Sequence, residues 1–169
     1  EYLDGFHYEL GWIYLIQGKL EEAALEFAWV GNSSDDANLA GGSLCKIGDI
    51  DIDKKEYAEA AKRFDNVLDK YPDSAWADYA EFQTANIFLA TDRYDQAILA
   101  YQSALTNFPA TPLKEKVIFQ LGLTYLKKGD FERAAAVFQM ALKEFSDGEM
   151  AAEARYHHAN ALYNLDRYA

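Results

Sequence analysis

The sequence predicts an all-α protein built from stacked pairs of antiparallel helices, and three observations lead to this fold class. Half of the 169 residues are hydrophobic and 15% are aromatic, which is enough to form a core. Only three prolines and ten glycines interrupt the chain, so we expect long helices joined by short turns. A pattern of small and aromatic residues also recurs every 37 residues, which indicates a repeat architecture.

The repeat is clearest where a small residue is followed four positions later by a large one. The small residues are Ala23, Ala60, Ala97 and Ala134, and the aromatic ones are Phe27, Phe64, Tyr101 and Phe138. An upstream column of small residues consists of Gly11, Gly48, Ala85, Gly122 and Ala159. We expect the small residues to lie where two helices cross and the aromatic rings to fill the space beside them, because one helix pair cannot bury its apolar face alone.

These columns divide the chain into a single array of five units. The units span residues 1–33, 34–72, 73–109, 110–146 and an incomplete 147–169, and each is expected to contain two helices. Within a unit the apolar residues recur three and four positions apart, which is typical of one helical face. Because the fifth unit lacks its second helix, we expect the chain to be a fragment of a larger protein.

Local signals predict where the helices begin and end. Asp73-Ser74 and Thr111-Pro112 are typical of helix starts. The second helix of a unit is expected to end at an aromatic residue before a breaker: Tyr71-Pro72, Phe108-Pro109 and Phe145-Ser146. In the first unit, Gly31-Asn32 predicts a left-handed helix end instead. A turn between the two helices of each unit is predicted at Gly18, Lys55, Asp92, Gly129 and Asp166.

The residues resemble the tetratricopeptide repeat (TPR) family. The resemblance is carried by Leu10-Gly11-Trp12-Ile13-Tyr14 and Leu121-Gly122-Leu123-Thr124-Tyr125, by the Ala-x-x-x-Phe pattern and by the terminal aromatic-Pro. It implies a right-handed α-solenoid, the TPR superhelix, although the period exceeds the family's usual length of about 34 residues. Long units with Tyr-Pro-Asp-Ser junctions resemble TPR proteins of the bacterial cell envelope, namely the Tol-Pal accessory protein and the barrel-assembly lipoprotein. This favours the periplasm or cell envelope over the cytoplasm.

In TPR arrays the first helices line a concave groove, so the resemblance implies a groove that binds a partner's peptide or helix. The residues that it places there are Tyr8, Trp12, Cys45, Asp49, Tyr79, Phe82, Asn86, Lys116, Phe119, Leu123, Tyr156, Asn160 and Tyr163. The alternative is that the rings are core residues, because aromatic stripes at helical spacing are commonly buried. Asp49, Asn86 and Asn160 are better site candidates, since polar groups gain nothing from a place in the core.

The net charge and its distribution limit the classes of partner that the chain is expected to bind. The net charge of −12 opposes nucleic-acid binding, and no apolar run approaches the length of a membrane-inserted helix. Residues 1–56 contain 4 basic and 12 acidic residues, whereas Lys114, Lys116, Lys127 and Lys128 cluster later. The acidic start can steer a basic protein partner, or it is simply a solvated face.

The sequence motifs that could bind a metal ion or support catalysis are incomplete. Residues 49–53 imitate the start of a calcium loop but lack its glycine and its final glutamate. Adjacent His157 and His158 diverge on a helix, and Cys45 has no base near it in sequence, so we expect no metal site, no cofactor and no catalytic residue. The sequence thus predicts a protein-binding scaffold. The alternatives are a spacer or a segment that self-assembles into homo-oligomers through its open array ends, and then an enzyme domain using Asp49 and a histidine.

Overall fold

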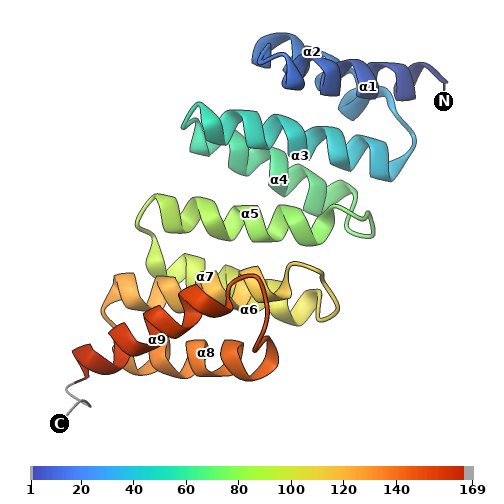
Figure 1. The fold of residues 1–169 in the computed structure, drawn as a ribbon. Helices are drawn as coiled ribbons and strands as arrows, with labels where there is room; N and C mark the ends of the chain where they lie inside the picture. Colours follow the sequence, from blue (N-terminus) through green and yellow to red (C-terminus); the bar gives the residue numbers. More distant parts are fainter. Residues whose placement is uncertain (1, 166–169) are drawn as a thin grey trace. The chain divides into compact units, whose positions relative to one another are not determined.

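The computed structural model describes residues 2–165, and in this range it contains nine α-helices and no β-strand (Figure 1). The all-α fold class is therefore confirmed. The helices are α1 (Tyr2–Ile16), α2 (Leu20–Ser33), α3 (Ala37–Asp53), α4 (Tyr57–Lys70), α5 (Ala77–Ala90), α6 (Tyr94–Asn107), α7 (Lys114–Lys128), α8 (Phe131–Glu144) and α9 (Ala151–Asn164). The chain forms two compact units, an N-terminal unit of residues 1–84 and a C-terminal unit of residues 85–169.

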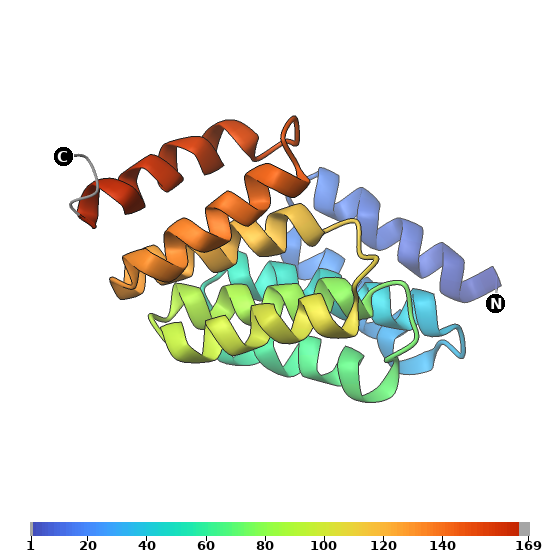
Figure 2. The same cartoon turned by 90° about the horizontal axis from the view of Figure 1, so that it is seen from below.

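Within each unit, consecutive helices pack side by side. In the N-terminal unit α1 packs on α2, α2 on α3 and α3 on α4. In the C-terminal unit α6, α7, α8 and α9 pack in the same succession, which the two views make clear (Figures 1 and 2). No helix among residues 2–165 combines the length and the apolar character needed to cross a membrane.

Glycine lies at three of the helix crossings, beneath a fully buried ring. A Cβ atom added to Gly48 would lie 2.6 Å from Cζ of Phe64. The corresponding distances are 2.8 Å from Gly11 to Phe27 and 2.7 Å from Gly122 to Phe138. These distances are shorter than carbon atoms tolerate, so the paired helices approach this closely only because the side chain is absent.

The predicted turns between paired helices share one backbone conformation. Gly18, Lys55, Asp92 and Gly129 have φ values of 72°, 62°, 57° and 82°, all in the left-handed region. Glycine adopts this conformation freely, whereas Lys55 and Asp92 are strained by it. The last predicted turn residue, Asp166, lies outside the described residues.

The predicted helix starts lie too early along the chain, because α5 begins at Ala77 and α7 at Lys114, whereas most predicted helix ends are confirmed. The C-caps of α4, α6 and α8 are Tyr71, Phe108 and Phe145, as predicted. The predicted left-handed end at Gly31-Asn32 is wrong, because α2 continues to Ser33 and its C-cap, Ser34, is extended. Gly31 instead provides space, since a Cβ there would lie 3.2 Å from Cδ2 of Leu44 on α3.

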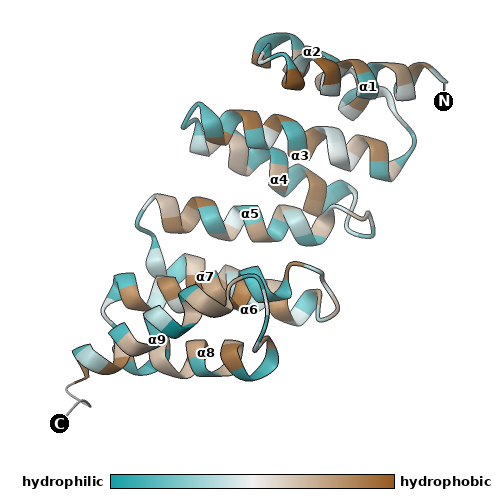
Figure 3. Cartoon of the chain, viewed as in Figure 1, coloured by the Kyte–Doolittle hydropathy of each residue, from teal (hydrophilic) through white to brown (hydrophobic). Residues whose placement is uncertain are grey.

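Hydrophobic and hydrophilic residues are interspersed along the helices (Figure 3). A core cluster of the N-terminal unit contains Ala23, Phe27, Ile47 and Ile50. Asp51 on α3 is an exception, because it is a buried carboxylate, whereas Tyr14 and Phe88, one repeat before and after it, are aromatic. Its carboxylate lies 3.5 Å from Nε of Arg63, and burial nevertheless raises its pKa above the ordinary value.

The glycine crossings can be tested with a matched pair of substitutions. We expect Gly48→Ala to lower the free energy of unfolding by about 1–3 kcal/mol, because the buried Phe64 ring cannot move aside. In Gly5→Ala, on α1, the added Cβ meets no atom within 4 Å. This substitution should raise the free energy of unfolding by up to about 1 kcal/mol, because alanine has the higher helix propensity. Urea unfolding followed by far-ultraviolet circular dichroism measures both, and equal stability of the two variants would contradict the packing argument.

Candidate functional site

In the N-terminal unit the predicted groove residues divide into buried and partly exposed side chains. Cys45 and Phe82 are buried and belong to the core. Tyr8 and Trp12 on α1, Asp49 on α3 and Tyr79 on α5 are partly exposed. Trp12 and Tyr8 both meet the ring of Phe27 edge-on, so they cover the core while one side stays accessible.

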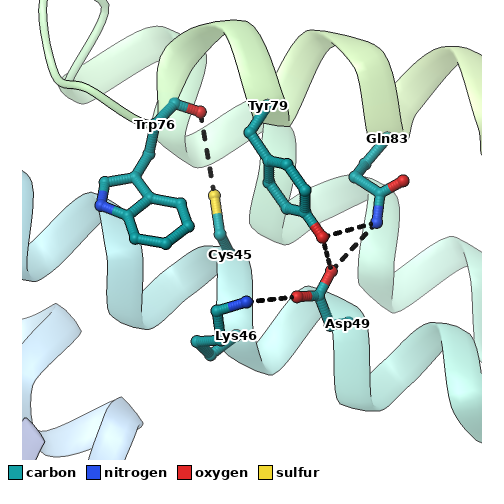
Figure 4. A network of polar contacts seen from close by, with 6 residues as sticks. All are labelled: Cys45, Lys46, Asp49, Trp76, Tyr79 and Gln83. Carbon is teal, nitrogen blue, oxygen red and sulfur yellow. Dashed lines mark hydrogen bonds and ion pairs between the residues drawn. The ribbon is translucent and has the colours of Figure 1, made fainter. Parts of the chain in front are cut away.

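Asp49 is the centre of a polar network between α3 and α5 (Figure 4). The Tyr79 hydroxyl donates to Oδ1 of Asp49 at 2.7 Å, and Nε2 of Gln83 donates to the same oxygen at 3.0 Å. The other carboxylate oxygen accepts from Nζ of Lys46 at 2.9 Å. Both oxygens of this partly exposed carboxylate are therefore occupied, and its orientation is fixed.

Lys46 lies among aromatic rings as well as beside Asp49. Its Nζ atom is 5.2 Å from the ring centroid of Trp12, 5.4 Å from that of Trp76 and 5.5 Å from that of Tyr79. At such distances an ammonium is attracted by the negative face of a ring. We call this arrangement, made of Trp12, Asp49, Trp76 and Tyr79 around the Lys46 ammonium, the cation cage.

Burial sets the protonation of the neighbouring groups. It raises the pKa of Tyr79, and the charge of Asp49 raises it further, so the hydroxyl remains a donor at neutral pH. Burial also raises the pKa of Cys45, whose Sγ lies 4.0 Å from the Trp76 carbonyl oxygen. Cys45 is thus a protonated packing thiol with none of the thiolate character that a nucleophile needs.

In the C-terminal unit, two predicted residues stabilise the helix pairs. Asn86 accepts a hydrogen bond of 2.6 Å from the hydroxyl of the buried Tyr101. Phe119 is buried and meets the rings of Phe138 and His157 edge-on. Leu123 is partly exposed, and the exposed Lys116 lies 3.4 Å from the carboxylate of Glu149.

Three other predicted residues form an open surface on α9. The side chains of Tyr156 and Tyr163 are 66% and 70% exposed. Together with Asn160 they line a pocket of about 460 Å³ that Ala159 and Asn164 complete. We call Tyr156, Asn160 and Tyr163 the α9 surface.

Sequence reasoning missed Lys46, Trp76 and Gln83. The spacing of Lys46 and Asp49, three residues apart on one helix, was the available signal for their ion pair. No spacing pattern could have placed Trp76, because it lies just before α5 and reaches back to α3, where a Cβ on Gly42 would be 2.7 Å from its Nε1 atom.

The two units differ strongly in charge. Residues 1–84 contain 7 basic and 18 acidic residues, a net charge of −11, whereas residues 85–169 contain 9 and 10, a net charge of −1. The partly exposed residues of the N-terminal unit therefore lie in a negative field, which attracts cations.

Comparison with known families identifies the repeat. Residues 42–128, slightly more than half of the chain, match the model of the YfiO family, described as outer membrane lipoprotein. Residues 119–169 match a tetratricopeptide-repeat model. The resemblance to TPR proteins, including those of the cell envelope, is thereby confirmed. No curated protein matches the sequence.

Solved structures share the fold at low sequence identity. A tetratricopeptide repeat protein from Parabacteroides merdae is 16% identical with a TM-score of 0.81, and the match covers 99% of this chain but only 62% of that protein. BtubC (BKLC) from P. vanneervenii is 15% identical with a TM-score of 0.78, covering 94% and 71%. MamA from Desulfovibrio magneticus RS-1 is 18% identical with a TM-score of 0.69, covering 97% and 92%. The α-solenoid of TPR type is therefore shown, a fold typical of protein-protein interaction scaffolds.

His157 offers a test of the packing beneath the α9 surface. It stacks on Phe138 at 5.7 Å, and burial lowers its pKa against the opposing charge of Glu153. The unfolded chain then binds a proton more readily, so stability is lost as the pH falls from about 7 to about 5. His157→Phe keeps the stacked ring and should flatten this part of the pH dependence. Urea midpoints at both pH values measure it, and an unchanged slope would contradict the assignment.

Proposed function

The chain belongs to the YfiO family of outer membrane lipoproteins and is built from tetratricopeptide repeats, and on this basis we propose that it is a scaffold of the cell envelope. In this proposal the faces of its first helices hold a peptide or helix of a partner protein. Peptide recognition of this kind uses aromatic side chains as anchors and polar side chains to fix the register.

The observation that carries the proposal is the exposure of large aromatic side chains on the α9 surface. Tyr156 and Tyr163 leave most of their ring area in water although core positions are near. Asn160 lies between them in the same pocket and supplies an amide. The Asn160 amide oxygen accepts from Nδ2 of Asn164 at 2.7 Å, which holds this amide beside the two rings. Exposed rings beside a polar side chain are typical of binding surfaces.

The other predicted groove residues have supporting roles in this proposal. Phe82 and Phe119 are buried, so replacing either by alanine tests folding more than binding. Asp49 and Asn86 hold Tyr79 and Tyr101 respectively by hydrogen bonds. The described contacts of Asp49 include no histidine, so the enzyme alternative based on that pair gains no support.

A cross-linking experiment tests the proposed binding surface without disturbing the core. A photo-reactive phenylalanine analogue at Tyr163 should form an adduct with a specific partner protein in the producing cells, because that position would face the bound chain. The matched control is Leu99 on α6, which is equally exposed but lies on a second helix. Mass spectrometry identifies the adducts, and the same adducts from both positions, or none from Tyr163, would contradict the proposal.

Self-assembly through one face of α1 is a second candidate, favoured by the exposed apolar residues of this helix. Leu3, Phe6 and Ile13 are exposed there. The residues one repeat later, Ala40, Ser43 and Ile50, are buried on α3, which packs on α2. Their counterparts on α9, which packs on α8, are the buried residues Ala151, Ala154 and Ala161. The exposed face of α1 therefore matches a face that later repeats bury against a helix.

This second candidate makes its own prediction. If two copies associate through α1, the mass measured by sedimentation equilibrium should rise with concentration, and Phe6→Glu with Ile13→Glu should abolish the rise by placing charges in the interface. Leu25→Glu on α2, also exposed, serves as the control and should associate like the parent. A parent protein that stays monomeric at high concentration would exclude self-assembly through this face.

A further inference from the structure

The cation cage of the N-terminal unit has the composition of a binding site for a positively charged side chain. Three aromatic rings and one carboxylate surround a single ammonium, with ring distances of 5.2–5.5 Å and an ion pair of 2.9 Å. The rings come from α1, from the segment before α5 and from α5 itself, whereas the lysine comes from α3. The fold therefore assembles the site from α1, from α3 and from the continuous stretch that leads into α5.

Each wall of the cage is held by contacts that do not involve Lys46. The Trp76 indole lies over Gly42, where a Cβ would approach its Nε1 atom to 2.7 Å, and it meets the Tyr79 ring edge-on. Asp49 is fixed by the Tyr79 hydroxyl and Gln83 (Figure 4). Trp12 packs edge-on against Phe27. Each wall therefore has contacts besides those to Lys46.

Two properties favour the exchange of the Lys46 ammonium for another cation. A lysine ammonium is carried on a flexible four-carbon stem, and the Lys46 side chain is 15% exposed, so it can extend into water by rotation. The surrounding unit has a net charge of −11, which attracts an incoming cation. An arginine is suited to this exchange, because its guanidinium stacks on aromatic faces and is more weakly hydrated than an ammonium.

We propose that the cation cage recognises an arginine side chain of the bound partner segment, and that Lys46 is an internal substitute which this arginine displaces. The inference rests on the proposed function as a peptide-binding scaffold and specifies the chemistry of its ligand. Occupation by Lys46 reduces the fraction of molecules whose cage is open, and apparent affinity falls in proportion to that fraction. Removing Lys46 should therefore strengthen binding, which is the opposite of what loss of a direct ligand contact would do.

The probes are N-acetyl-arginine amide and its uncharged counterpart, N-acetyl-citrulline amide. The readout is the indole N–H signal of each of the three tryptophans in a nitrogen–proton correlation spectrum. Trp12 and Trp76 line the cage, whereas Trp29 stacks on His7 and serves as an internal control. The arginine probe should shift the Trp12 and Trp76 signals, and the citrulline probe should shift none.

The decisive variant is Lys46→Ala, for which we expect an affinity for the arginine probe at least about 10-fold above that of the parent, since the cage is then open in every molecule. Lys62→Ala removes the same charge from the same unit at an exposed site paired with Glu59, and should bind like the parent. Asp49→Asn added to Lys46→Ala should cancel the gain. Lys46→Gln is a second variant, with the same expected direction, for use if Lys46→Ala does not fold.

Three results would overturn the inference: no gain for folded Lys46→Ala or Lys46→Gln, an equal gain for Lys62→Ala, or equal binding of the citrulline probe. These outcomes are independent of the cross-linking at Tyr163, which lies in the other unit. Adducts at Tyr163 without arginine binding would support the scaffold function but show that the cation cage does not bind an arginine of the partner. Arginine binding without adducts would support the cage and reject the α9 surface.

Discussion

A ring seated on a glycine where two helices cross is the contact on which three of the helix pairs depend, α1–α2, α3–α4 and α7–α8. Because Gly11, Gly48 and Gly122 have no side chains, Phe27, Phe64 and Phe138 can lie directly against the first-helix backbone. The rings are completely buried, so the contact excludes water over a large aromatic area. This close approach fixes the rotation of each first helix about its axis and thereby decides which of its residues face away from the pair.

The face of a first helix that points away from its paired helix contains both core and surface residues. Where a predicted groove residue packs against neighbouring rings, as at Phe119, the side chain is buried and stabilises the repeat. On α9, by contrast, Tyr156 and Tyr163 are exposed. One repeating pattern thus yields different surfaces along the chain, because exposure depends on neighbours rather than on residue type.

Electrostatics distinguishes the N-terminal unit from the C-terminal one. Its excess of acidic residues creates a field that favours cations, and Lys46 supplies a positive charge where Asp49 and three rings converge. Burial keeps the Tyr79 hydroxyl protonated, so it donates to the carboxylate and does not compete with it as an anion. The result is a preorganised ion pair surrounded by aromatic rings on a partly exposed face.

The sequence alone determined the repeat, the all-α fold and the turns, because these depend on local spacing: a small residue, a ring four positions later, and a residue that accepts a left-handed turn. Gly31 shows the limit of that reasoning. A small residue is needed there because Leu44 packs closely against it, and not because the chain turns there. Only the tertiary structure decided that Cys45, Phe82 and Phe119 are buried whereas Tyr156 and Tyr163 are exposed. It alone brought Trp12, Lys46 and Trp76 together, because these residues lie on separate segments and the distances between them depend on how whole helices stack.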